Sequence, residues 1–288
     1  ERLFAARRFP AAQEAYRELA AVATGAERER AQVRSGAAAF RARRTAAAYQ
    51  ALSALQPSDA EAGAERLYYL GECYRRMGRE SAFMDTVRRL GEQHPQSPWH
   101  EEALFSAGNY FLLRRDAARY AGYYRTLSEQ FPSGKYAALA HWRVAWRHYR
   151  SGDLEAARRL LEAQVVRFPR GSQVAAALYW LGRLAEPHNT AVALAYFRKA
   201  ADHFPHFFYG TLAEQKLREA RLAPAATLPD NVSRVLAAVP VYRPNLTTLP
   251  LPADLPEHRR KVEALEAAGL PDLAVLELSH AGEDSTHS

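Results

Sequence analysis

The sequence predicts an all-α fold: a right-handed α-solenoid of helical hairpins, followed by a proline-rich connector and a short helical hairpin. Two observations predict it, an even spacing of prolines and a pair of side-chain columns with the same spacing. Five prolines lie 38, 37, 37 and 36 residues apart, at Pro57, Pro95, Pro132, Pro169 and Pro205. An interval of about 37 residues fits two antiparallel helices with their turns, so each interval predicts one hairpin.

The two columns are a large ring and a small side chain that recur three residues apart. The rings are Tyr68, Phe105, Trp142 and Tyr179, and the small residues are Gly71, Gly108, Ala145 and Gly182. Residues three apart share one face of a helix, so we expect the small residue to let a neighbouring helix approach while the ring fills the space beside it. The columns therefore mark the first helix of each hairpin.

The second helix of each hairpin leads up to the proline, which ends a helix and restricts the residue before it. These helices are predicted at residues 81–95, 117–132, 154–169 and 191–205, after the turn residues Arg79, Asp116, Asp153 and Thr190. One hairpin cannot cover both of its faces, so stacked copies share a continuous core. The pattern resembles a tetratricopeptide-like superhelix, and it assigns residues 1–221 to a superhelical repeat domain.

Past residue 221 the sequence changes character. Seven prolines fall between Pro224 and Pro256, so residues 222–257 are predicted to form an extended connector. Helical periodicity returns in residues 258–288, which we interpret as the start of a helical linker domain. Its apolar residues Val262, Leu265, Leu273 and Leu276 lack covering helices in this sequence, so we expect the reading frame to continue past Ser288.

The charge balance favours anionic partners. The chain carries 39 basic and 32 acidic residues, a net charge of +7, which attracts anionic polymers in general. Its arginines are scattered along helical segments rather than gathered in a block, and no polar columns vary from repeat to repeat as an RNA-reading solenoid requires. We therefore expect no nucleic-acid partner. No apolar run of eighteen residues occurs, so no transmembrane segment is predicted.

Motifs for catalysis and metal binding are missing from the sequence. Cys73 is the single cysteine, and it has neither a disulfide partner nor metal-ligand spacing. His203 and His206 flank a proline at a helix end, with no carboxylate or cysteine in register. There is no glycine-rich phosphate loop and no Gly-x-Ser-x-Gly turn. The sequence thus predicts no cofactor, no metal site and no catalytic residue in this chain.

Glu80 needs separate treatment, because Glu80 to Phe83 spell Glu-Ser-x-Phe, the form in which lysozyme-like lytic enzymes carry their catalytic acid. The repeat places Glu80 in the first turn of a second helix, where a carboxylate is favoured by the helix dipole. Its equivalents in the other hairpins are Ala117, Leu154 and Ala191. No Gly-Leu-Met-Gln-like segment follows, so we interpret Glu80 as a helix-start residue.

Residues 177–217, ALYWLGRLAEPHNTAVALAYFRKAADHFPHFFYGTLAEQKL, resemble the end of the superhelical domain of soluble lytic murein transglycosylases. The resembling features are a Tyr-Trp-x-Gly-Arg helix, an alanine-rich helix and a Phe-Tyr-Gly segment. The resemblance implies a periplasmic enzyme, exported by a secretory signal, that cleaves the MurNAc-GlcNAc bond of peptidoglycan and leaves a 1,6-anhydro product. Nothing after His280 resembles the catalytic domain of that family, so the chain would be its non-catalytic superhelical portion, inactive alone.

A curved solenoid presents the first helices of its hairpins along one surface. Arg143, Arg147, Trp180 and Arg183 would offer planar donors and a ring there, which suit carboxylates and sugar faces. The partners expected are peptidoglycan, another anionic wall polymer, or other cell-wall enzymes. The alternative function is a tetratricopeptide-type protein-interaction scaffold of the cell envelope that binds a peptide on the same surface.

Overall fold

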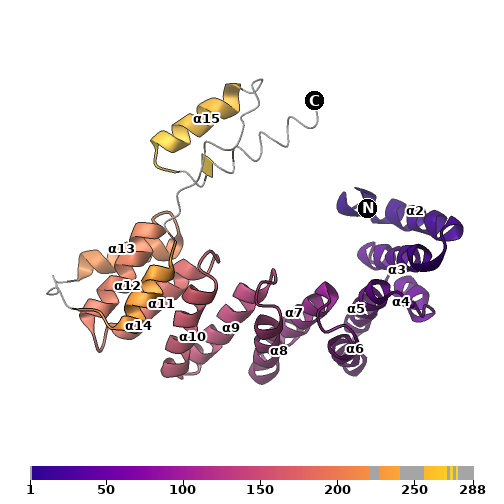
Figure 1. Cartoon of the computed structure of the whole chain (residues 1–288), viewed down its shortest axis with the longest axis horizontal. Coiled ribbons are helices and arrows are strands. Elements are labelled where there is room, and N and C mark those ends of the chain that lie inside the picture. The colour runs from indigo at the N-terminus through magenta and orange to yellow at the C-terminus, as the bar shows by residue number, and fades with distance from the viewer. Residues whose placement is uncertain (1, 221–226, 241–255, 271–272, 275–276, 278–288) are drawn as a thin grey trace. The chain divides into compact units, whose positions relative to one another are not determined.

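The computed structural model describes residues 2–220, 227–240, 256–270, 273–274 and 277 (Figure 1). Within them the chain forms fifteen helices and no strand. It divides into two compact units, residues 1–160 and 161–288. The helices are α1 (Arg2–Ala5), α2 (Phe9–Val22), α3 (Gly25–Arg41), α4 (Thr45–Ser53), α5 (Ala60–Arg76), α6 (Glu80–Gln93), α7 (Pro98–Leu113), α8 (Ala117–Gln130), α9 (Ala137–Arg150), α10 (Leu154–Arg167), α11 (Val174–Ala185), α12 (Thr190–His203), α13 (Phe208–Glu219), α14 (Asp230–Ala238) and α15 (Pro256–Ala267).

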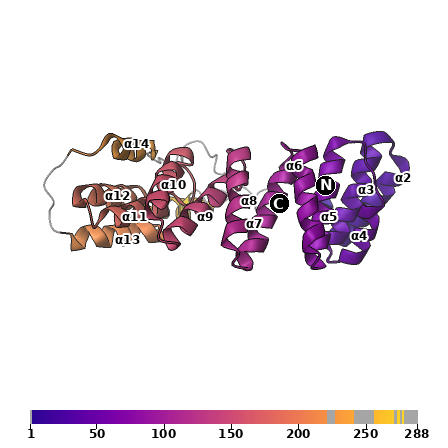
Figure 2. The same cartoon turned by 90° about the horizontal axis from the view of Figure 1, so that it is seen from below.

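Unit 1 is a stack of helical hairpins, as predicted. Each hairpin pairs two consecutive helices: α3 with α4, α5 with α6, and α7 with α8 (Figures 1 and 2). Neighbouring hairpins meet through their first helices, because α5 also contacts α3 and α7. A shared core of buried residues from α5 to α9 includes Phe83, Phe111 and Tyr124. A second core, from α3 to α5, includes Cys73, which is fully buried. The sequence analysis assigned residues 1–221 to the repeat domain but placed no helix before the one that contains Tyr68, so it did not locate α1 to α4.

The small-residue column is the line of closest approach between the two helices of a hairpin. A Cβ atom built on Gly108 would lie under 3.0 Å from the ring of Tyr124 on α8. The same clash occurs between Gly71 and Thr86, and between Gly182 and Phe197 in unit 2. Gly36 approaches Leu52 in the same way, which extends the column one hairpin beyond the part that the sequence revealed.

From α1 to α10, the turn between the two helices of each hairpin contains one residue in the left-handed conformation. These residues, with their φ angles, are Arg7 (57°), Arg43 (63°), Gly78 (71°), Arg115 (59°) and Gly152 (81°). At each one the next residue donates its backbone N–H to a carbonyl five residues earlier; Asp116 to Phe111 (3.0 Å) is an example. This is the hydrogen bond that closes a Schellman helix end, and it reverses the chain into the second helix.

The second helices begin within one residue of the predicted positions and end two residues before each proline, at Gln93, Gln130, Arg167 and His203. Asp116 caps α8 as expected, because its carboxylate accepts the N–H of Arg119 at 3.0 Å. The predicted turn residue Thr190 is instead the first residue of α12. Asn189 is its cap, since Asn189 Oδ1 accepts the N–H of Val192 at 3.1 Å.

Unit 2 contains α11 to α15. The extended connector predicted for residues 222–257 is interrupted by α14, which buries Val232 and Val235 and contacts α12. Prolines 229 and 240 flank this helix rather than break it, as is common just outside helix ends. In the predicted linker hairpin, Val262 and Ala274 form a small core with Leu265, whereas Leu273 is exposed. Leu276, residues 241–255 and residues 278–288 lie outside the described residues.

Candidate partner-binding groove

Unit 1 contains a cavity of about 570 Å³ along its first helices. We call it the groove. Its lining comes from the end of α3, from α5 and α7, and from the turn before α9, so it crosses three successive hairpins. The lining residues are Arg41, Tyr68, Arg75, Glu102, Phe105, Ser106, Asn109, Tyr110, Leu113, Arg114, Lys135 and Tyr136.

Aromatic rings form one part of the groove lining. Phe105 and Tyr136 stack face to face, with ring centroids 3.8 Å apart and an interplanar angle of 4°. Tyr68 lies against Trp99 at 5.2 Å. Tyr68 and Phe105 belong to the predicted ring column, so the residues that fill space between hairpins also present apolar surface to the groove. Leu113 adds a side chain that is 83% exposed.

Two buried or half-buried carboxylates hold part of the basic lining in place. Glu102 pairs with Lys135 and accepts a hydrogen bond from the hydroxyl of Tyr136 at 2.9 Å. The hydrogen bond to Glu102 raises the pKa of Lys135 above its ordinary value. Glu72 pairs with Arg75 at 2.7 Å and accepts a hydrogen bond from Ser106. Both cations are therefore fixed and charged, but neutralised by a neighbour.

Arg41 and Arg114 are different, because neither forms an ion pair with any described residue. The Nε of Arg41 donates a hydrogen bond to the hydroxyl oxygen of Tyr69 at 3.5 Å. The guanidinium of Arg114 lies over the ring of Tyr110, 3.5 Å from its centroid, and donates to the Tyr110 carbonyl at 3.4 Å. Glu102 interacts electrostatically with Arg41, and Glu80 with Arg114, but neither carboxylate contacts its guanidinium directly. Both guanidinium groups therefore keep hydrogen-bond donors for a ligand, which favours an anionic one.

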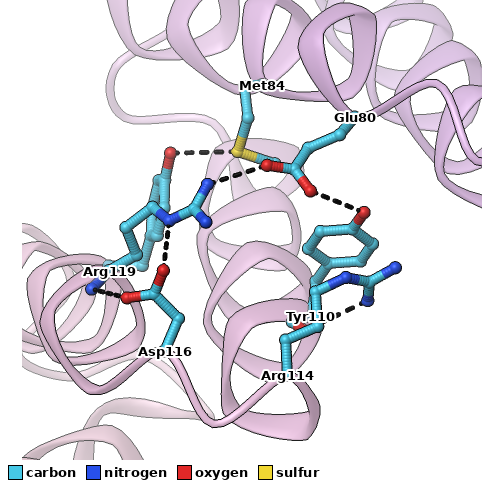
Figure 3. Close-up of polar contacts among 7 residues, drawn as sticks. Glu80, Met84, Tyr110, Arg114, Asp116 and Arg119 are labelled. Atoms are coloured by element: carbon cyan, nitrogen blue, oxygen red, sulfur yellow. Dashed lines mark hydrogen bonds and ion pairs between the residues drawn. The ribbon is translucent and has the colours of Figure 1, made fainter.

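Glu80 does not line the groove but contacts Tyr110, which does (Figure 3). α6 begins at Glu80, one residue before the predicted start, so Glu80 lies in the first turn of this helix as predicted. The Glu80 carboxylate accepts a hydrogen bond from the Tyr110 hydroxyl at 3.0 Å and pairs with Arg119 at 2.7 Å, and Arg119 also pairs with Asp116 at 2.6 Å. Glu80 therefore ties its own hairpin to the next one and orients Tyr110, whose ring carries Arg114.

The protonation of Glu80 is the opposite of what a catalytic acid needs. The hydrogen bonds from Arg119 and then Tyr110 lower the pKa of Glu80 below its ordinary value. A glycosidase acid needs a raised pKa, so that it holds a proton near neutral pH. The lowered pKa agrees with the interpretation of Glu80 as a helix-start residue, and the absence of a catalytic role stays a prediction.

The four predicted surface residues fall in two units, and the structure describes each pair within its own unit. Arg143 on α9 donates to Asn109 Oδ1 at 2.6 Å, so it touches a groove residue without lining the groove. Arg147, on the same helix, buries its Nε atom. In unit 2, Trp180 contacts the rings of Tyr179 and Tyr209. Arg183 pairs with Glu186 at 2.6 Å. That all four share a ligand surface stays a prediction.

The repeat explains how the prediction missed the groove. The 37-residue equivalents of the four residues are Ser106 (for Arg143 and Trp180), Tyr110 (for Arg147) and Asn109 (for Arg183). All three equivalents line the groove. The four predicted residues therefore occupy the same repeat positions as groove-lining residues, but they lie one or two hairpins after the groove in the sequence. A search of the same columns in the hairpin at residues 98–130 would have found it.

Of the comparisons with known proteins, the family match agrees with the helical-repeat fold. The tetratricopeptide repeat family matches residues 67–97, which are most of α5 and α6. Among the solved structures that match is one described as the apo form of RapI. It is 15% identical with a TM-score of 0.49, and the match covers 96% of this chain and 81% of that one. No curated protein sequence matches the chain. Over its described residues the chain is an all-α protein of tetratricopeptide-like helical repeats.

Two further observations concern only the part of the chain that the structure describes. None of its helices combines the length and the apolar character needed to cross a membrane. No group of three or more His, Cys, Asp or Glu side chains is placed to hold a metal ion.

Proposed function

We propose that this chain is a protein-interaction scaffold that binds a peptide segment of a partner protein in the groove. The observation that carries the proposal is the groove itself, a cavity of about 570 Å³ built from three hairpins with aromatic and basic walls. Its size falls within the range of about 300–1,000 Å³ that is usual for ligand sites. The match of residues 67–97 to the tetratricopeptide repeat family supports it.

The groove offers the kinds of contact that an extended peptide needs. The stacked rings of Phe105 and Tyr136 and the exposed Leu113 supply apolar surface for side chains. Asn109 supplies an amide beside the rings, and its Oδ1 is already held by Tyr124 and Arg143. Arg114 supplies a charge-assisted donor, which contributes more than a neutral hydrogen bond.

The test is selection of peptides from a random library with the 288-residue chain, followed by affinity measurements on single variants. Arg114→Ala should weaken a selected peptide about tenfold, as expected for loss of one charged hydrogen bond. Arg125→Ala is the matched control, because Arg125 is an exposed arginine of α8 outside the groove. Equal binding by the wild type and Arg114→Ala, for every peptide selected, would contradict the groove as the site.

The second candidate is the superhelical portion of a periplasmic lytic transglycosylase, binding peptidoglycan. The observation that favours it lies in residues 177–217, the segment that resembles that family. The ring of Tyr209 meets those of Tyr179 and Trp180 at 5.5 and 6.5 Å. A Cβ atom on Gly210 would overlap the carbonyl oxygen of Phe204. The Tyr-Trp and Phe-Tyr-Gly parts of the resemblance thus meet in space, and the glycine has no room for a side chain.

Sedimentation with purified peptidoglycan separates the two candidates. A basic wall-binding chain should sediment with peptidoglycan at low salt and be released as the salt concentration rises, because exposed charge contacts are screened. Absence of binding at low salt would leave the peptide scaffold as the function, and the cell-envelope location would lose its support.

A further inference from the structure

A second cavity in unit 1 lies at one end of the α5–α6 hairpin, where the segment before α5 meets the start of α5 and the end of α6, and it is separate from the groove. Its volume is about 310 Å³. We call it the α5–α6 cavity. The basic side chains that line it are Arg66 on α5, Arg89 on α6 and His94 at the end of α6. None of its lining residues also lines the groove.

Arg66 is a buried arginine, only 8% exposed. Its Nε donates to the carbonyl of Leu52 at 2.8 Å and its Nη2 to that of Ser53 at 3.5 Å, at the end of α4. These carbonyls satisfy part of the guanidinium but do not neutralise its charge. Burial, and then the nearby Arg89, lower the pKa of Arg66 below its ordinary value. The surroundings thus oppose its charge.

Arg89 shares the cavity and forms no hydrogen bond or ion pair with any described residue. The one carboxylate in the lining, that of Asp59, is already occupied. It accepts two hydrogen bonds from Arg30, at 3.0 and 2.8 Å, and one from the N–H of Ala62 at 2.9 Å. Two guanidinium groups therefore face one cavity without a counter-charge of their own.

The other hairpins show that the fold does not require these basic residues. At the position of Arg66 they have Ala103, Ala140 and Ala177, all buried. At the position of Arg89 the other three hairpins have Thr126, Ala163 and Lys199, and at that of His94 they have phenylalanine, Phe131, Phe168 and Phe204. Lys199 is the one basic residue among these equivalents. The combination of three basic side chains is therefore a feature of the α5–α6 hairpin among these four hairpins.

We infer that the α5–α6 cavity binds a phosphate-type dianion between the guanidinium groups of Arg66 and Arg89. A guanidinium presents parallel N–H groups that match two oxygens of a phosphate, and a dianion neutralises both charges. The carbonyls of Leu52 and Ser53 fix Arg66 in advance, so little side-chain freedom is lost on binding. The ligand is either free phosphate or a phosphorylated side chain, and the site is independent of the groove.

The test is titration calorimetry of the 288-residue chain with inorganic phosphate, and with a phosphoserine peptide beside its unphosphorylated form. We expect one saturable site for phosphate or for the phosphopeptide. Arg89→Ala should weaken that site about tenfold, as expected for loss of a charged partner. Arg88→Ala should leave it within twofold, because the neighbouring Arg88 pairs with Asp85 and Glu92 and does not line the cavity. Arg89→Thr, the residue of the next hairpin, is the second variant and keeps the site testable should Arg89→Ala unfold.

The two probes identify the source of the dianion. Phosphopeptide binding at least tenfold tighter than phosphate identifies a phosphorylated protein, whereas equal affinities identify the free anion, and both results support the site. The proposal is overturned if neither probe saturates the wild type, or if Arg88→Ala weakens binding as much as Arg89→Ala. Because peptides selected for the groove contain no phosphate, failure here leaves the proposed function untouched.

Discussion

Gly108 permits the close approach of α7 and α8, because a methyl group at this position would clash with the ring of Tyr124. Gly122 lies in α8 with open space around it, and a Cβ atom there would meet nothing within 4 Å. The same residue type thus has opposite roles in one hairpin. At Gly108 it permits close approach, and at Gly122 it only weakens the helix.

Gly108→Ala should therefore destabilise the chain by about 1–3 kcal/mol, the usual cost of overpacking a core. Gly122→Ala should instead stabilise it by about 1 kcal/mol, the difference in helix propensity. Urea unfolding of both variants measures the two free energies. Equal effects of the two changes would mean that the helices of the hairpin do not approach at Gly108.

Glu80 makes the stability of unit 1 depend on pH. Its folded-state pKa is lower than the ordinary value of 4.5, so the unfolded chain binds more protons between these two values. The stability due to Glu80 is then present above about pH 4.5 and is lost as the pH falls through the folded-state pKa. We expect Glu80→Gln to flatten the fall of the urea midpoint below pH 4.5. Glu129→Gln, at an exposed carboxylate near the end of α8, is the control and should keep the wild-type slope.

At the scale of the element, the turn between paired helices was hidden from the sequence by its residue types. Five left-handed positions recur in the turns inside the hairpins. Glycine adopts that conformation without a Cβ clash, but only two of the five are glycine, Gly78 and Gly152. Arginine occupies the other three. The repeat of prolines and rings predicted where the helices lie to within a few residues. The turns needed the backbone itself, because arginine is rare at positive φ.

Arg115→Gly should stabilise the chain by about 0.5–1 kcal/mol. A non-glycine residue in the left-handed region costs about 1–2 kcal/mol, and part of the gain is offset by the greater freedom of glycine in the unfolded chain. Arg114→Gly, one residue earlier at a φ of −87°, gains no such relief and should destabilise. Thermal unfolding of the two variants compares them directly, and a lower melting temperature for Arg115→Gly would contradict the argument.

At the scale of the whole molecule, the sequence predicted the fold because stacked hairpins reuse one set of apolar columns. It did not predict the groove or the α5–α6 cavity, because their linings depend on polar side chains that differ between hairpins. Arg66, for example, interrupts a column that is alanine in three other hairpins. The helix α14 was also missed, since its flanking prolines outweighed three spaced valines, Val232, Val235 and Val239, that are buried.

A stack in which hairpins contact only their neighbours should limit the spread of damage. Phe111 is fully buried and stacks on Tyr123 at 5.7 Å, so Phe111→Ala should cost about 3–5 kcal/mol. Hydrogen exchange should then quicken in α7, α8 and the adjoining α6 and α9, while α2 keeps its protection. Uniform loss of protection from α2 to α9 would show that unit 1 unfolds as one cooperative body.

The burial of Cys73 has a practical consequence. Its pKa is raised to about 12 by burial, so almost no thiolate, the reactive form, exists near neutral pH. The native chain should therefore not react with maleimides, although it contains a thiol. A cysteine introduced at the exposed Leu113 would be the one site to take a fluorophore, and that dye would report each occupant of the groove in real time.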